Sequence, residues 1–370
     1  MFENDNDFRK KKYFELSSRI AQFDNTQLCS LLLNSESDSS SGWGTNNITI
    51  FGQHKVFVKS VPVTDTEYAN MFCTKNLYNL PTYCSYGFGS TGFGVFRELV
   101  TYIKTTNWVL EGSIATFPLM YHYRIIPFTR HQIDVDPNHL KKYVEYWDNS
   151  ENAGQYFWEA NTNYELVLFL EYIPYVLETW LRENPDKLEK PLEELRSTIT
   201  FLKEKEIIHF DAHFRNILTD GGRVYLTDFG LALDRSFALT QEEISFFEHN
   251  KFYDYGEILR NLGHLIGWTY DSCSEDDKSR IMKKYGIRED LKPFELRLIL
   301  LDNIEQIQSD GIMKLDDFYV ATIIEYRSII VLMQDFFVDM WSNNNKDTEF
   351  PSSKLQQLLE ETGFAHSTYC

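Results

Sequence analysis

The chain has 370 residues, of which 43% are hydrophobic and 15% aromatic, so it can bury a large core and is long enough for two lobes or domains. Its formal net charge of −19 argues against a general nucleic-acid binder, because nucleic-acid phosphates are bound by clustered cations and the one basic run, residues 9–12, is expected to be the exposed face of a helix. The five scattered cysteines, without a CxxC pair, predict neither a disulfide framework nor a zinc site and fit a reducing compartment.

The first half of the chain is predicted to combine helices with a sheet. Apolar residues at helical spacing, among them Phe8, Phe14, Leu16 and Ile20, indicate a first helix over residues 7–24. Further elements follow in chain order: a helix at 27–33, a hairpin whose strands at 48–50 and 56–59 flank the turn Gly52-Gln53, helices near 65–78 and 94–105, a strand at 117–126, a helix near 138–160 and an apolar strand at 166–172.

The second half is predicted to be mainly helical. Helical patterns cover residues 175–183 and 191–205, two short strands at 217–219 and 224–226 flank a turn, and only helices are expected from residue 242 on. A β-rich half followed by an α-rich half predicts an α+β fold with two lobes. The expected boundaries are a helical extension at 1–38, an N-lobe at 39–173 and a helical C-lobe at 174–370.

Residues 207–232, IIHFDAHFRNILTDGGRVYLTDFGLA, form the stretch that indicates chemistry. It contains His209-x-Asp211, then Asn216 five residues after that aspartate, a short hairpin, and Asp228 at the start of Asp-Phe-Gly. Phosphoryl transfer needs a carboxylate that orients the attacking hydroxyl and accepts its proton, and it needs ligands that hold Mg²⁺ against the phosphates. One loop and one strand end supply these side chains here.

This stretch resembles the catalytic loop and the magnesium loop of the protein-kinase-like superfamily, whose signatures are H-R-D-L-x-x-x-N and D-F-G. The resemblance implies that Asp211 is the catalytic base, that Asn216 and Asp228 are ligands of Mg²⁺, and that His209 is structural. It covers about residues 40–270 and implies a two-lobed kinase-like fold with ATP and Mg²⁺ as cofactors.

Upstream, Lys59 closes the strand VFVK and resembles the family's lysine that pairs with the nucleotide phosphates. Lys55 lies on the same strand at an even spacing, so an ordinary solvated strand lysine stays an alternative for Lys59. The glutamate that pairs with the lysine is expected to be Glu98, in the middle of a helix among apolar neighbours, with Glu67 as the competitor. Phe57 stands where the family usually has a small residue over the adenine.

Two further segments are candidates for nucleotide binding. Gly42 and Gly44 form a G-x-G before the first hairpin strand and are the candidate phosphate loop, although a plain turn is an alternative. The segment LFLEYI resembles the family's hinge, in which the backbone from Glu171 to Ile173 would hydrogen-bond an adenine edge.

The motifs differ in the branch of the superfamily that they favour. Phe210 replaces the arginine of many regulated protein kinases, so classical phosphorylation of an activation loop is not expected. His213 is similar to aminoglycoside and choline kinases, whereas the Asp-Phe-Gly-Leu-Ala at 228–232 is closer to protein kinases. Residues 105–126 resemble a group of divergent bacterial protein-kinase sequences.

The sequence therefore supports three hypotheses. The first is an ATP-dependent Ser/Thr protein kinase of divergent type with a protein substrate, the second is a small-molecule kinase, and the third is a pseudokinase that binds nucleotide or a partner without transfer. We expect no nucleic-acid partner and no membrane span, since no apolar run reaches roughly 20 residues. A cytoplasmic location is expected, and secretion into a host by a route without an N-terminal signal stays open.

Overall fold

The computed structural model describes residues 5–33, 36–38, 45–86, 92–127, 137–160, 162–342 and 345–365. The chain divides into two compact units, each assembled from three segments. The first unit comprises Met1–Pro174, His209–Asp211 and Tyr225–Phe247, and the second comprises Tyr175–Ile208, Ala212–Val224 and Glu248–Cys370. The first unit contains the large sheet and the second is mainly helical, so the expected mixture of helix and strand is confirmed.

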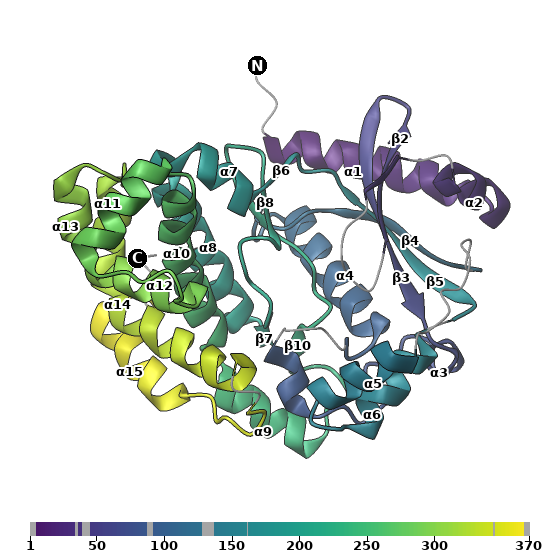
Figure 1. The fold of residues 1–370 in the computed structure, drawn as a ribbon. Coiled ribbons are helices and arrows are strands. Elements are labelled where there is room, and N and C mark those ends of the chain that lie inside the picture. Colours follow the sequence, from purple (N-terminus) through teal and green to yellow (C-terminus); the bar gives the residue numbers. More distant parts are fainter. Residues whose placement is uncertain are drawn as a thin grey trace. The chain divides into compact units, whose positions relative to one another are not determined.

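A five-stranded antiparallel sheet forms the framework of the first unit, in the order β1-β2-β3-β5-β4 (Figure 1). Its strands are β1 (Glu36–Asp38), β2 (Thr45–Phe51), β3 (His54–Val63), β4 (Met120–Pro127) and β5 (Tyr164–Glu171). The hairpin expected around Gly52-Gln53 is confirmed, because β2 pairs with β3 across this turn and Gly52 has the positive φ of 66° that such a turn favours.

Strand β5 lies between β3 and β4 and is buried along almost its whole length, as its continuous apolar sequence predicts. Lys59 is paired in register with Leu168, and Phe57 with Leu170. Since side chains alternate between the faces of a strand, Phe57 and Lys59 share one face of β3. Val56 and Val58 are fully buried on the opposite face.

Helices accompany this sheet in the first unit: α1 (Asp5–Ala21), α2 (Asn25–Leu33), α3 (Asp65–Ala69), α4 (Val95–Glu111), α5 (Pro137–Tyr146) and α6 (Glu151–Glu159), with α9 (Gln241–Asn250) running across the division between the units. The helix expected over 65–78 is wrong in length, because α3 ends after five residues. The helix expected over 138–160 is two helices, since Asp148 and Asn149 adopt positive φ angles of 55° and 58° between them.

Helix α1 buries one of its charged residues. Arg9 is 3% exposed and shares the buried stripe with Leu16 and Ile20, whereas Phe8 and Phe14 are 50% and 63% exposed. The expectation that residues 9–12 form an exposed basic face is therefore wrong for Arg9. The physical reason is a buried counter-charge from another part of the unit, which a helical periodicity based on apolar residues does not reveal.

The second unit contains β6 (Tyr175–Val176), α7 (Leu177–Glu183), α8 (Glu189–Glu204), β7 (Ile207–Ile208), β8 (Ile217–Thr219), α10 (Tyr253–Asp271), α11 (Glu275–Tyr285), α12 (Pro293–Asp302), α13 (Ile304–Asp310), α14 (Asp317–Phe337) and α15 (Ser352–Thr362). Strand β9 (Val224–Leu226) crosses the division, and β10 (Leu233–Asp234) belongs to the first unit. The strands expected at 217–219 and 224–226 are confirmed, as is the helical character of the described residues after 242.

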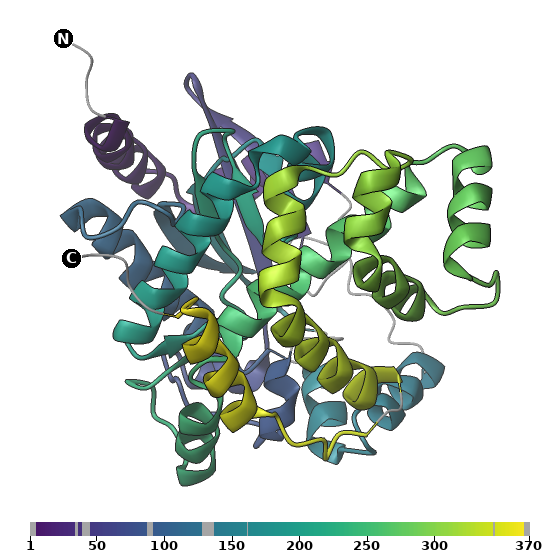
Figure 2. The same cartoon turned by 90° about the vertical axis from the view of Figure 1, so that its left-hand side faces the viewer.

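The core of the second unit is built around α10, against which α14, α12 and α8 pack (Figure 2). Two glycines allow α14 to approach closely. A Cβ atom at Gly256 would lie 2.6 Å from Sδ of Met333, and one at Gly263 would lie 2.8 Å from Cγ2 of Ile330. Helix α10 is thereby fixed by packing along most of its length, and its polar side chains are presented from a rigid element.

Candidate active site

Three residues far apart in the sequence meet in the first unit at the ammonium group of Lys59. Its Nζ lies 2.7 Å from Oε1 of Glu98 and 2.9 Å from Oδ1 of Asp228. Lys59 comes from β3, Glu98 from the first turn of α4, and Asp228 lies just after β9. The structure thus brings together the lysine, the glutamate and the Asp-Phe-Gly aspartate that the sequence singled out.

The two competing residues lie elsewhere. Glu67 is 1% exposed and serves the local backbone, because its carboxylate accepts the N–H groups of Thr64 at 2.9 Å and of Val95 at 3.0 Å. It therefore closes the capping box of α3 and also binds the start of α4. Lys55 is exposed, and its Nζ lies 5.1 Å from the ring centroid of Tyr172.

The exposure of the three site residues is graded. The side chain of Glu98 is 4% exposed and that of Lys59 is 16% exposed, whereas the side chain of Asp228 is 42% exposed. Glu98 is thus enclosed behind the lysine, and Asp228 presents carboxylate surface to solvent. A carboxylate that pairs with the lysine and still reaches solvent is suited to a ligand that arrives from solution.

Burial and charge act in opposite directions on these groups. Burial disfavours the charged form of Lys59, but the carboxylates of Asp228 and Glu98 outweigh burial and raise the lysine pKa well above its usual value. Desolvation of the side of the Asp228 carboxyl that faces Lys59 opposes its ionisation, yet Lys59 lowers its pKa. Burial raises the pKa of Glu98 in spite of Lys59. At neutral pH the lysine is charged and Asp228 is ionised.

Tyr102 of α4 contacts the backbone N–H of this aspartate and the side chain of the residue before it. Its phenol oxygen accepts the N–H of Asp228 at 3.1 Å and lies 2.9 Å from the hydroxyl of Thr227. Asp228 has a φ of +65°, a conformation that a non-glycine residue keeps only when its surroundings hold it there. The sequence analysis missed Tyr102, although it stands four residues after Glu98 and so lies on the same face of α4.

The segment before Asp211 is oriented by His209, which is fully buried. The N–H of Asp211 approaches Nδ1 of His209 at 3.2 Å, and Nε2 lies 3.0 Å from the carbonyl oxygen of Thr227. An Nδ1 that accepts leaves the ring proton on Nε2, which then donates to Thr227. His209 thus connects the backbone before Asp228 to the backbone of Asp211, consistent with a structural histidine.

Phe210, the residue before Asp211, is a packing residue. It is 1% exposed and has a φ of +63°. Its ring is stacked with Phe246 at a centroid distance of 5.4 Å and lies edge-on to Tyr86 at 6.0 Å. The residue before Asp211 is therefore fixed by aromatic contacts and supplies no cation to a phosphate.

Helix α4 is also joined to the chain that follows Asp228. Nη2 of Arg97 lies 2.6 Å from Oε1 of Glu243, and Nε donates to the carbonyl oxygen of Thr74 at 2.8 Å. The guanidinium lies between the rings of Phe93 and Phe237, at 5.5 Å from each centroid. The buried guanidinium of Arg97, the residue before Glu98, fixes the first turn of α4 to the start of α9.

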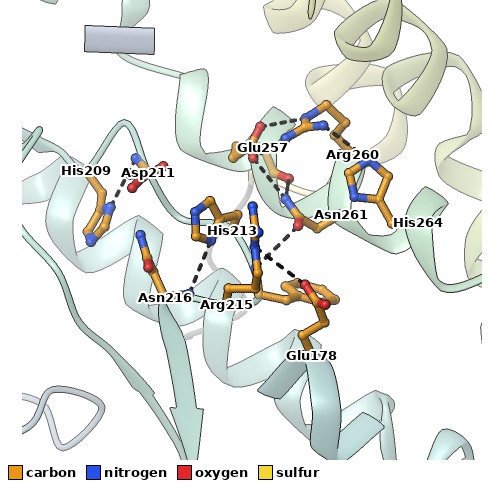
Figure 3. A network of polar contacts seen from close by, with 11 residues as sticks. Glu178, His209, Asp211, His213, Arg215, Asn216, Glu257, Arg260, Asn261 and His264 are labelled. Atoms are coloured by element: carbon orange, nitrogen blue, oxygen red, sulfur yellow. Dashed lines mark hydrogen bonds and ion pairs between the residues drawn. The ribbon is translucent and has the colours of Figure 1, made fainter. Parts of the chain in front are cut away.

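The loop at 212–216 belongs to the second unit and is held by side chains of that unit (Figure 3). The N–H of Asn216 lies 3.2 Å from Nδ1 of His213 and 2.8 Å from its carbonyl oxygen. Burial lowers the pKa of His213, so its ring stays neutral and can accept. The N–H of Phe214 donates to Oδ1 of Asn261 at 3.3 Å, and its carbonyl oxygen accepts the N–H of Glu178 at 3.1 Å.

Asn261 is part of a polar network on α10 (Figure 3). Its Nδ2 donates to Oε1 of Glu257 at 2.9 Å, and the same carboxylate accepts from Arg260 at 2.6 and 2.8 Å. Nη1 of Arg260 lies 3.2 Å from Nε2 of His264, whose pKa is lowered well below its usual value by burial and by Arg260. These residues position the loop that carries Asn216, and the sequence analysis did not single them out.

The hinge and glycine-loop candidates have different outcomes. Gly42 and Gly44 lie outside the described residues. The backbone N–H of Glu171 donates to the carbonyl oxygen of Leu119 at 2.7 Å, so it does not serve an adenine edge. The groups that stay candidates for hydrogen bonds to an adenine edge are the carbonyl of Glu171 and the backbone of Ile173. Ile173 is partly exposed.

Asp228 offers a bound Mg²⁺ a suitable carboxylate in this unit. Among the described residues, no group of three or more His, Cys, Asp or Glu side chains could hold a metal ion. Mg²⁺ in phosphotransfer sites needs no such group, because one or two carboxylates, waters and substrate phosphates complete its octahedral shell. The exposed carboxylate of Asp228 fits this chemistry.

Comparisons with known proteins assign no family to the chain. The sequence matches no protein-family model, and it matches no curated protein. In the part of the chain that the structure describes, none of the helices combines the length and the apolar character that crossing a membrane requires. The geometry of the site, together with the motif resemblance, supports the proposal that follows.

Proposed function

We propose that the protein is an ATP- and Mg²⁺-dependent phosphotransferase with a kinase-like two-lobed fold, and that it transfers the γ-phosphate to a serine or threonine hydroxyl of a protein. The observation that carries this proposal is the contact of Lys59 with both Glu98 and Asp228. Kinase activity depends on a lysine–glutamate ion pair between the sheet and a helix, together with the Asp-Phe-Gly aspartate. The paired state of Lys59 supports an assembled site.

Bound Mg·ATP supplies the phosphoryl group and the cation that neutralises its charge. Lys59 contributes a fixed positive charge, and Glu98 holds the ammonium group in place from its enclosed position. Asp228 offers its exposed carboxylate as a metal ligand. The role of Asn216 as a second ligand stays a prediction from the sequence.

Asp211 is proposed to orient the acceptor hydroxyl and to take its proton. Its backbone N–H is fixed by His209, and the preceding Phe210 is enclosed by aromatic rings. A base whose own N–H and preceding residue are both fixed keeps its side chain near one geometry, which general-base catalysis requires.

A small-molecule acceptor is the second candidate function, and His213 favours it. The histidine stays neutral and accepts the N–H of Asn216. A histidine at this position of the loop is similar to aminoglycoside and choline kinases. Phosphotransfer to a metabolite would use the same Lys59, Asp211 and Asp228.

The decisive experiment follows labelled γ-phosphate from Mg·ATP onto the protein itself and onto a generic basic protein. Wild type is compared with Asp211→Asn, Asp228→Asn and the control Asp186→Asn, whose side chain is 62% exposed. Labelled protein that appears only with wild type and with the control variant supports a protein kinase. ATP turnover that needs a metabolite extract supports the small-molecule kinase, and absence of any turnover supports a pseudokinase.

A further inference from the structure

We propose that Arg9 of α1 is a positioning residue for nucleotide binding, because it fixes the end of β5 from which the hinge segment 172–173 continues. The N-terminal helix is then a part of the nucleotide site. The part of this inference that concerns nucleotide binding rests on the proposed function. The other part, that Arg9 orders the end of β5, is tested independently of activity.

The guanidinium of Arg9 uses all three of its nitrogen atoms inside the first unit. Nε lies 3.2 Å from both carboxylate oxygens of Glu171, and Nη2 lies 2.7 Å from Oε2. Nη1 donates to the carbonyl oxygen of Ala115 at 2.8 Å, and Nη2 also donates to that of Phe117 at 2.7 Å. The guanidinium carbon lies 5.2 Å from the ring centroid of Tyr225.

These contacts connect α1 with three other segments at one point. Glu171 is the last residue of β5, Ala115 and Phe117 belong to the chain that leads into β4, and Tyr225 lies in β9. The carboxylate of Glu171 also accepts the N–H of Leu119 at 3.1 Å. The end of β5 is thus fixed through both the side chain and the backbone of Glu171.

Burial makes this arrangement depend on Arg9. The two side chains are 3% and 7% exposed, so neither charge is compensated by water. Removing one partner of a buried ion pair leaves the other charge without compensation, and the surrounding backbone then has to move or admit water. The backbone that follows Glu171 is the hinge segment, so such a movement would displace the hinge.

The geometry requires an arginine. The planar fork of a guanidinium binds a carboxylate with two nitrogen atoms and still has donors for two carbonyl oxygens, whereas a lysine ammonium is a point donor. Arg9→Lys therefore keeps the charge but loses part of the contacts. A graded effect, larger for Arg9→Met than for Arg9→Lys, is expected.

The experiment uses the full chain and four variants: Arg9→Lys, Arg9→Met, the double variant Arg9→Met with Glu171→Gln, and the control Lys11→Met at an exposed position of the same helix. The double variant removes the uncompensated buried carboxylate, so it recovers stability in part and separates folding from positioning. Amide hydrogen exchange is measured without nucleotide, and KM for Mg·ATP and kcat are measured with the generic basic protein.

For Arg9→Met and the double variant we expect faster exchange at residues 115–119 and 169–173, with the β2–β3 hairpin unchanged. We also expect KM for Mg·ATP to rise roughly tenfold, equivalent to about 1.4 kcal/mol, with kcat nearly kept. Exchange that is unchanged or uniformly faster would overturn the positioning role, as would a lower kcat at constant KM. A wild-type protein without phosphotransfer would refute the proposed function and, with it, the role of Arg9 in nucleotide binding. Amide hydrogen exchange would still show whether Arg9 orders the end of β5.

Discussion

The backbone N–H of Asp228 donates to the phenol oxygen of Tyr102 at a distance of 3.1 Å. Tyr102→Phe removes this acceptor and leaves the partly buried N–H of Asp228, a residue with positive φ, without it. We expect a loss of stability of about 1–3 kcal/mol and a reduced rate of phosphotransfer. Urea unfolding and the transfer assay measure the two effects, with Tyr175→Phe, at a 51% exposed position, as the control. Wild-type values for both would show that the contact does not hold Asp228.

Lys59 and Glu98 should act as one unit. Lys59→Met and Glu98→Gln are each expected to lower the phosphotransfer rate by about 100-fold, because each removes a preorganised charge from the site. Lys55→Met, on the same face of β3, should keep nearly full activity. The double variant is expected to be little worse than either single variant, since both remove the same ion pair. Losses that simply multiply would contradict the coupling.

The ion pair of Arg97 with Glu243 should dominate the stability of the segment after Asp228. Glu243→Gln keeps an oxygen for the N–H of Thr240, which the carboxylate accepts at 2.9 Å, but it leaves Arg97 without its counter-charge. We expect a loss of about 3 kcal/mol in the free energy of unfolding. Glu242→Gln, at the exposed preceding position, is the control and should change it little. Equal effects in chemical denaturation would exclude a special role for the pair.

His264 predicts an acid limb in the stability of the second unit. Its pKa in the folded state is lowered, so the unfolded state binds the proton first, and the stabilisation is present above about pH 6.5 and lost as pH falls toward the folded pKa. The slope for one half-buried group stays below about 1.4 kcal/mol per pH unit.

His264→Gln tests this directly, because glutamine keeps an acceptor for Arg260 and does not titrate. Unfolding followed between pH 5 and 7.5 should show a shallower decline toward acid in the variant than in wild type. Superimposable pH profiles would assign the acid limb to other groups. His213, whose pKa is also lowered by burial, is expected to supply the remaining slope.

Elements with a regular period were predictable from the sequence, as were contacts that a motif prescribes. The β2–β3 hairpin follows from alternation around Gly52-Gln53, and the apolar run of β5 indicated a strand buried on both faces. Lys59, Glu98 and Asp228 were selected through the resemblance of their surroundings, and the structure places them in contact. The catalytic roles of these residues remain predictions.

Contacts that depend on tertiary burial were not predictable. The helical pattern after Asp65 ends early because the backbone turns at Asn70 and Phe72, whose φ is +60°. Phe8 and Phe14 fit the helical spacing of α1 together with Leu16 and Ile20, yet both are exposed and the packed stripe contains Arg9. Nothing in the local sequence of Arg9 indicates that Glu171 compensates its charge.

The pair of Arg9 and Glu171 has a consequence for how the protein is made. Glu171 is synthesised 162 residues after Arg9, and contacts of such separation form slowly. Until Glu171 is synthesised, the guanidinium of Arg9 lacks the carboxylate with which it is buried in the folded unit. A chain from which α1 had been cleaved would keep Glu171 as a buried anion without a cation, so an intact α1 is a condition for a stable sheet.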